Sequence, residues 1–98
     1  MTALHEQAVI IEWDIEPSLD FIFEAEDQLS QAISSGELGE VDGNEVGNGT
    51  ATIYLYGPSC ESIWKTIEPV ARQLSPRPAR ALIRPGGPEI EPRQVSLS

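Results

Sequence analysis

The chain has 98 residues, of which 16 are acidic and 6 are Lys or Arg, and its net charge is −10. This length allows one domain with one modest core, and a hydrophobic content of 40% argues against disorder throughout. The acidity excludes phosphate-directed nucleic-acid binding, which depends on clustered cations. No apolar run approaches the ~20 residues that a membrane span needs.

The acidic residues are concentrated in the first half of the chain. Residues 1–49 contain twelve Asp and Glu and no Lys or Arg, so this half carries −12, whereas residues 50–98 carry +2. Such a layout is typical of a solubilising surface, or of an acidic face for a basic protein partner. The single Cys60 cannot form an intramolecular disulfide and the first residues show no secretory signal, which together favour the cytoplasm.

The first two expected elements are a strand and a helix. Residues 8–15 form a short segment rich in β-branched and aromatic residues, which predicts a strand. Val9, Ile11, Trp13 and Ile15 would lie on one face of this strand. Residues 16–18 then begin a helix, with a proline in its first turn, and residues 34–36 end it. The apolar stripe predicted for this helix comprises Leu19, Ile22, Leu29 and Ile33, with Ala25 and Ala32 beside them.

A glycine-rich, acidic segment follows at residues 37–49. Residues 40–45 form a weak predicted strand, and residues 46–49 form the turn after it, because Asn-Gly accepts positive φ at both central positions. Residues 50–56 give the clearest strand pattern in the chain. Ala51, Ile53 and Leu55 alternate there with Thr52, Tyr54 and Tyr56.

The second half predicts another helix and two strands. Ser59 suits a helix N-cap, and Pro69 is expected to kink the helix that follows. Residues 79–84 read as a strand, and residues 94–97 as a last short strand. The apolar stripe of this helix comprises Cys60, Ile63, Trp64, Ile67, Ala71 and Leu74.

The order of these elements predicts a single α+β domain over residues 1–98. The pattern β-α-β-β-α-β is that of the ferredoxin-like sandwich, in which right-handed crossovers place both helices on one face of an antiparallel sheet. The tail strand would extend the sheet beside the fourth strand. The first strand offers either Ile11 and Trp13 or Val9 and Ile15 to the core. The open face would carry Thr52, Tyr54, Tyr56, Glu12 and Asp14.

The middle of the chain resembles a group of small uncharacterised bacterial proteins. The similar motifs are the D-G-N-E segment at residues 42–45, the Y-x-Y-G-P strand end at residues 54–58 and the I-x-P helix at residues 67–69. The resemblance also includes a final arginine-containing strand with a Pro/Gly turn, and covers residues 8–97. Group members carry an acidic residue near residues 59–61, where this chain has Glu61. The resemblance implies the same fold and no particular reaction.

The first candidate site is the D-G-N-E segment. The side chains of Asp42, Asn44 and Glu45 offer closely spaced oxygen ligands, which suit a hard cation such as Ca²⁺ or Mg²⁺. The complete calcium-loop pattern is absent. The alternative is a bulged strand or turn in which Gly43 takes a special φ and the acids are solvated.

The second candidate is a partner-binding surface made of Tyr54, Tyr56, Glu40 and Asp42. Tyrosine is a frequent anchor in protein interfaces, and the carboxylates would attract a basic partner. The alternative is ordinary tyrosine on a sheet surface. Arg80 and Arg84 share a strand face and are expected to pair with Glu12 or Asp14 on a neighbouring strand.

No catalytic constellation, phosphate-binding loop or cofactor motif is recognisable, and Cys60 belongs to an apolar helix stripe. We therefore expect a non-catalytic binding or regulatory module that acts through protein contacts and holds no cofactor. The competing hypothesis is a small enzyme or ligand-binding domain that uses Asp42–Glu45, with or without a divalent metal. The acidity opposes close self-association, so we expect a monomer or a weak homodimer. The predicted acidic side comprises Glu24, Asp27, Glu37, Glu40, Asp42 and Glu45.

Overall fold

The computed structural model describes residues 7–33, 38–87 and 89–97. Its elements confirm the predicted order, including the strand in the tail. In chain order they are β1 (Gln7–Trp13), α1 (Leu19–Ala32), β2 (Glu40–Gly47), β3 (Thr50–Gly57), α2 (Cys60–Gln73), β4 (Arg80–Arg84) and β5 (Arg93–Ser96).

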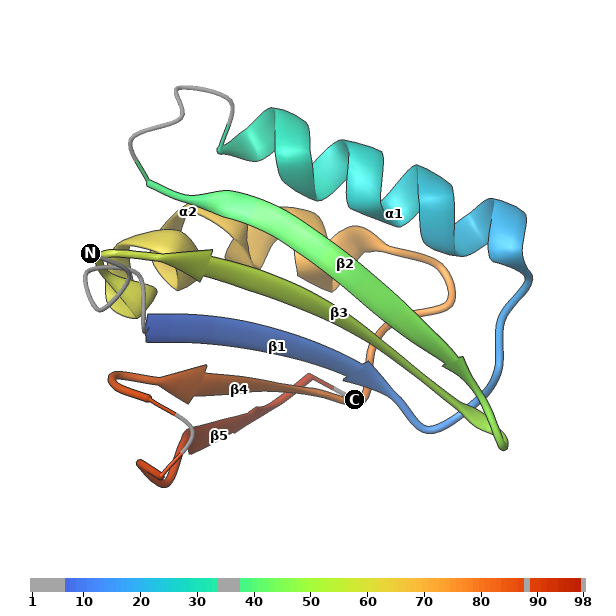
Figure 1. The fold of residues 1–98 in the computed structure, drawn as a ribbon. Helices are drawn as coiled ribbons and strands as arrows, with labels where there is room; N and C mark the ends of the chain where they lie inside the picture. Colours follow the sequence, from blue (N-terminus) through green and yellow to red (C-terminus); the bar gives the residue numbers. More distant parts are fainter. Residues whose placement is uncertain (1–6, 34–37, 88, 98) are drawn as a thin grey trace.

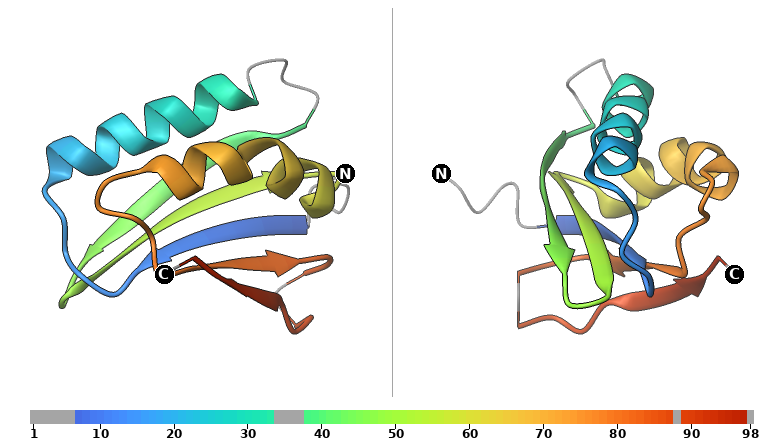
Figure 2. Two further views of the ribbon diagram at one scale, coloured as in Figure 1. Left: turned by 180° about the vertical axis from the view of Figure 1, so that it is seen from behind. Right: turned by 90° about the vertical axis from the view of Figure 1, so that its right-hand side faces the viewer.

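The strands form one antiparallel sheet in the order β2-β3-β1-β4-β5. Both helices lie on the same face of this sheet, and none of the described residues forms a helix on the other face (Figures 1 and 2). The order of the first four strands is that of the ferredoxin-like sandwich. The fifth strand pairs with β4, as predicted, so that β2 and β5 are the two edges of the sheet.

The central strand β1 contributes Val9, Ile11 and Trp13 to the core between the sheet and the helices. Val9, Ile11 and Trp13 are all buried, and they lie opposite buried residues of β3. The prediction that Ile15 shares this face is wrong, because β1 ends at Trp13 and Ile15 is 52% exposed. A strand's alternation continues only while the backbone stays extended, and the chain turns away from the sheet at residue 14.

Helix α1 begins three residues later than the sequence predicts. The hydroxyl of Ser18 accepts a hydrogen bond from the backbone N–H of Phe21 at 3.1 Å, so Ser18 is the N-cap and Pro17 precedes the helix. The predicted end at residues 34–36 lies outside the described residues. The buried stripe contains Ile22, Ala25, Leu29 and Ile33, as predicted.

Leu19 is the member of the predicted stripe that the structure corrects, since it is 54% exposed. The buried stripe begins at Phe21 and Ile22, which lie about one helical turn before Ala25. Leu19 lies outside this stripe, on a neighbouring side of the helix. Phe21 packs against the core instead and meets Trp13 edge to face, with 5.7 Å between the ring centroids.

The hairpin between β2 and β3 forms at the predicted Asn-Gly turn. Asn48 has a φ of 57° and Gly49 a φ of 83°, and two positive values are what a tight hairpin turn requires. Strand β2 extends to Gly47, beyond the predicted end at residue 45. Its register with β3 shifts between Val41 and Gly43, so the bulge considered for this segment is present.

Helix α2 starts at the predicted cap, since the hydroxyl of Ser59 accepts from the backbone N–H of Ser62 at 3.2 Å. Pro69 lies inside the helix, which continues to Gln73. The predicted apolar stripe from Cys60 to Leu74 is buried. In the part of the chain that the structure describes, neither helix is long and apolar enough to cross a membrane.

Candidate functional site

The helix-free face of the sheet carries the two tyrosines of the chain. Tyr54 and Tyr56 stack with 6.5 Å between their ring centroids and only 4° between their planes. They lie on β3, where every second residue points to the face opposite the helices. Tyr54 lies opposite Ile10 of β1, and Ile10 in turn lies opposite Leu82 of β4. The middle of this open face is therefore aromatic and aliphatic.

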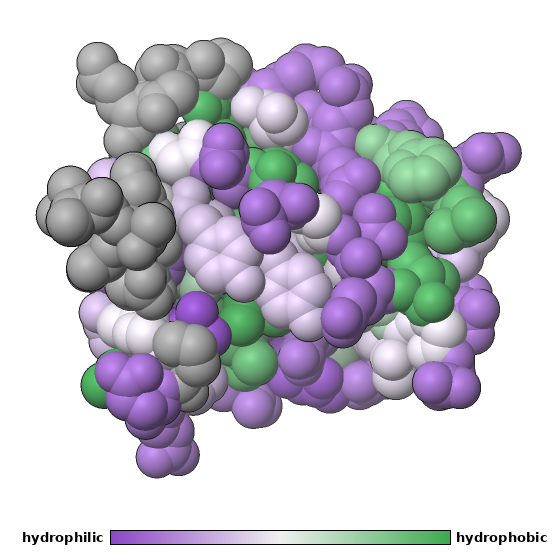
Figure 3. All heavy atoms as spheres, in the orientation of Figure 1, coloured by the Kyte–Doolittle hydropathy of each residue, from purple (hydrophilic) through white to green (hydrophobic). Residues whose placement is uncertain are grey.

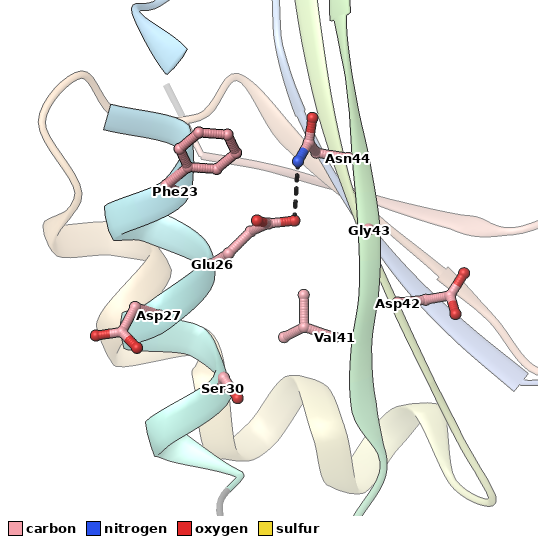
Figure 4. A pocket seen from close by; sticks show the side chains of 8 residues that line it. All are labelled: Phe23, Glu26, Asp27, Ser30, Val41, Asp42, Gly43 and Asn44. Carbon is pink, nitrogen blue, oxygen red and sulfur yellow. Dashed lines mark hydrogen bonds between the residues drawn. The ribbon is translucent and has the colours of Figure 1, made fainter. Parts of the chain in front are cut away.

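Strand β2 adds carboxylates beside the tyrosines. Glu40 lies opposite Tyr56, and Glu45 accepts a hydrogen bond from the Tyr54 hydroxyl at 2.9 Å. Asp42 is the additional residue of the bulge, and its side chain points away from α1 (Figure 4). The structure thus brings the predicted partner-binding residues Tyr54, Tyr56, Glu40 and Asp42 to one side of the sheet.

The three candidate metal ligands do not converge. The Asn44 amide points towards α1 and donates to the Glu26 carboxylate at 3.1 Å (Figure 4). Glu45 instead accepts the hydrogen bond from Tyr54 on the open face. Neighbouring residues of a strand point to opposite faces, so Asn44 and Glu45 lie on different sides of β2. In residues 7–33, 38–87 and 89–97, no group of three or more His, Cys, Asp or Glu side chains is placed to hold a metal ion.

The opposite side of the open face is basic but largely neutralised. Arg80 on β4 forms ion pairs with Glu12 at 2.9 Å and with Asp14, as the sequence predicts. Hydrogen bonds to Asp14 and then Glu12 raise the pKa of Arg80 above its ordinary value. Arg84 donates instead to the backbone carbonyl of Gly86 at 2.9 Å. The ion pairs between described residues include none with Glu40, Asp42 or Glu45, so the β2 side keeps its negative charge.

Cys60 is buried at the start of α2, where its side chain is part of the core. The residue is 1% exposed. Burial, and then the charge of Glu61, raise the pKa of the Cys60 thiol. A thiolate nucleophile requires the opposite shift. The backbone N–H of Cys60 donates to the side-chain carbonyl of Gln7 at 2.8 Å, which links the helix to β1.

Tyr54 should titrate at unusually high pH. Burial, and then the hydrogen bond and charge of Glu45, raise its pKa from 10.0 to about 12. The unfolded chain loses this proton first, so the contribution to stability is complete below pH 10.0 and is lost as the pH rises towards about 12. Ultraviolet titration of tyrosinate in a Tyr56→Phe background measures the pKa directly.

The control for this titration is Glu45→Gln, which removes the charge and keeps an oxygen that can accept a hydrogen bond. It should move the pKa of Tyr54 back towards 10.0. An unchanged pKa would mean that the contact between Glu45 and Tyr54 does not persist in solution.

Sequence reasoning missed two residues that face β2 from α1. Phe23 is 56% exposed, and Glu26 accepts the hydrogen bond from Asn44. A signal was present in the sequence, because Leu19 and Phe23 are four residues apart and therefore lie on one side of a helix. Phe23 and Glu26, together with Val41 and Asn44, line a region between α1 and β2 that is separate from the open face.

Comparison with known proteins finds no relative of this chain. No protein-family model, no curated protein and no solved structure matches the chain. The resemblance of residues 8–97 to the bacterial group with D-G-N-E, Y-x-Y-G-P and I-x-P motifs stays a prediction. Functional inference therefore depends on the geometry of the site alone.

Proposed function

We propose that this domain is a non-catalytic binding module whose open sheet face binds a basic segment of a protein partner. The observation that carries the proposal is the Tyr54–Tyr56 stack beside the carboxylates of Glu40, Asp42 and Glu45. An arginine or lysine can rest on a tyrosine ring and reach a neighbouring carboxylate at the same time.

The physical chemistry of the face favours this function over a purely solubilising role. The tyrosines are half-buried, and they lie beside the Ile10–Leu82 pair, so they present rigid apolar area with polar ends. Charge along β2 would steer a basic partner and accelerate its association, with a rate that falls as salt rises. The lone, buried Cys60 accords with a reducing compartment, and we place the protein in the cytoplasm on that basis.

The geometry of residues 42–45 favours this proposal over the competing metal or enzyme hypothesis. That hypothesis requires Asp42, Asn44 and Glu45 to act on one ligand, whereas Asn44 is bonded to Glu26 on the helix side and Glu45 to Tyr54 on the open side. The acidity also opposes tight self-association, so we propose that the module is a monomer or a weak homodimer.

The test is the affinity of a peptide of alternating arginine and glycine, measured by calorimetry at low and high salt. This probe has cations but no large apolar side chain. Replacing both Tyr54 and Tyr56 by Ala should weaken binding by more than about tenfold, because each lost interface anchor costs on the order of 1–2 kcal/mol. Replacing both by Phe keeps the rings and should retain most of the affinity.

A matched pair of charge variants separates local contacts from net charge. Glu40→Gln lies beside the tyrosines, whereas Glu91→Gln removes the same charge from the connection between β4 and β5. We expect the first to weaken binding more than the second. Equal effects, or an affinity that survives loss of both rings, would show that the open face is not the binding site.

A further inference from the structure

Helix α1 exposes an apolar stripe that the core does not use. Leu19 and Phe23 are 54% and 56% exposed, and Ile15, in the connection before the helix, is 52% exposed. Figure 3 shows hydrophobic residues gathered at the right-hand edge of the molecule, where α1 begins in Figure 1. Scattered apolar residues on a surface are ordinary, but a contiguous group of large ones marks an interaction site.

A groove runs beside this stripe, between α1 and the edge strand β2. It has a volume of about 520 Å³. In Figure 4, the Val41 side chain points from β2 towards the helix, and the Glu26–Asn44 hydrogen bond spans the space between the two elements. The lining of the groove includes Phe23, Glu26, Asp27 and Ser30 of α1 and Val41 and Asn44 of β2.

The outer edge of β2 forms the rim of the groove. Strand β2 is the terminal strand of the sheet, so its outward backbone groups have no strand partner among the described residues. The bulge at Asp42 interrupts the ladder with β3, but regular pairing resumes at Gly43 and continues to Gly47. This short regular edge can accept an additional strand, whereas the bulge limits indiscriminate pairing.

The charges around the groove select its occupant. Asp20, Glu24 and Asp27 are exposed on α1, and residues 1–49 contain no Lys or Arg. A second copy of the chain would bring the same negative helix to the groove, and an anionic membrane would be repelled in the same way. A basic segment is electrostatically complementary.

We propose that the groove binds an extended, basic segment of a partner protein, which adds as a strand to the Asn44–Gly47 edge. A large apolar side chain of the segment packs on Leu19 and Phe23, and a lysine or arginine lies near Glu26 and Asp27. The proposal does not depend on the function of the open face, because the groove lies on the helix side of β2 and the tyrosines lie on the other side.

The first experiment is selection of random peptides displayed on phage against the intact chain. Enriched sequences should combine a large apolar residue with lysine or arginine in an extended pattern. A selected peptide should bind Phe23→Ala about tenfold more weakly, as is typical of a lost interface anchor. The matched control is Ile90→Ala, which removes another exposed apolar side chain, between β4 and β5, and should leave affinity unchanged.

The second experiment tests strand addition by amide hydrogen exchange with and without the selected peptide. Exchange should slow within Asn44–Gly47, and Asp27→Lys should weaken binding while the thermal unfolding of both variants shows that they fold. Failure to enrich any peptide, binding that is indifferent to Phe23, or binding without protection of β2 would overturn the proposal. It would also be overturned if Phe23→Ala altered only self-association or only binding to vesicles of anionic lipid.

Discussion

The Trp13→Ala variant is expected to lose about 3–5 kcal/mol of its free energy of unfolding, the range for deletion of a buried aromatic side chain. Trp13 is 1% exposed and lies at the end of the central strand. Its ring meets Phe21 of α1, and its Nε1 donates to the backbone carbonyl of Pro76 at 3.0 Å. One side chain therefore joins β1, the start of α1 and the connection after α2. Because small domains are stable by only about 5–15 kcal/mol, this loss would leave the variant close to unfolding.

Denaturant unfolding of Trp13→Ala and Trp13→Phe separates the two contributions of the indole. Phenylalanine keeps most of the apolar contact but leaves the Pro76 carbonyl without its donor, which costs about 1–3 kcal/mol. We expect the phenylalanine variant to lie between wild type and alanine. A loss below about 1 kcal/mol for Trp13→Ala would contradict the packing described for this residue.

The second large effect is expected for Gly57→Ala, at the end of β3. A Cβ atom at Gly57 would lie 2.1 Å from the carbonyl oxygen of Leu38 and 2.9 Å from Cδ1 of Ile63. The first contact is with backbone just before β2, which cannot move without disturbing the pairing of β2 with β3. We expect a loss of about 3 kcal/mol, at the upper end for overpacking. Chemical denaturation measures it.

Gly87→Ala is the matched control for this substitution. A Cβ there would meet only the end of the flexible Glu89 side chain, at 2.8 Å, so stability should change by no more than about 0.5 kcal/mol. Similar losses for both variants would mean that the close approach of the backbones at Gly57 is absent in solution.

The sequence predicts the fold well because local patterns and topology agree. The alternation of Ala51, Ile53 and Leu55, the Asn48–Gly49 turn and the Ser59 cap each specify a local structure, and the right-handed crossover rule leaves few ways to connect them. The ends of elements are less predictable. Whether Ile15 stays in the strand depends on where the chain leaves the sheet, and that is decided by tertiary packing.

The candidate sites also combine features that local sequence patterns predict with features that tertiary packing decides. Alternation places Tyr54 and Tyr56 on one face, and pairing with β2 brings Glu40 beside them. Strand alternation alone places Asn44 and Glu45 on opposite faces. Which face each residue takes could not be derived in the same way, because the bulge sets the direction of each side chain after Asp42. The exposure of Phe23 depends on how α1 lies over the sheet, which one stripe of apolar residues does not determine.

Backbone amide chemical-shift mapping shows directly whether the open sheet face binds a basic partner. The alternating arginine–glycine peptide is titrated into the isotope-labelled chain at low salt. If the face binds the peptide, the largest shifts occur at Glu40, Glu45, Tyr54 and Tyr56, and they decrease when salt is added. Shifts confined to α1 and α2 would contradict it. So would shifts at Glu40 and Glu45 that persist unchanged when Tyr54 and Tyr56 are both replaced by Ala.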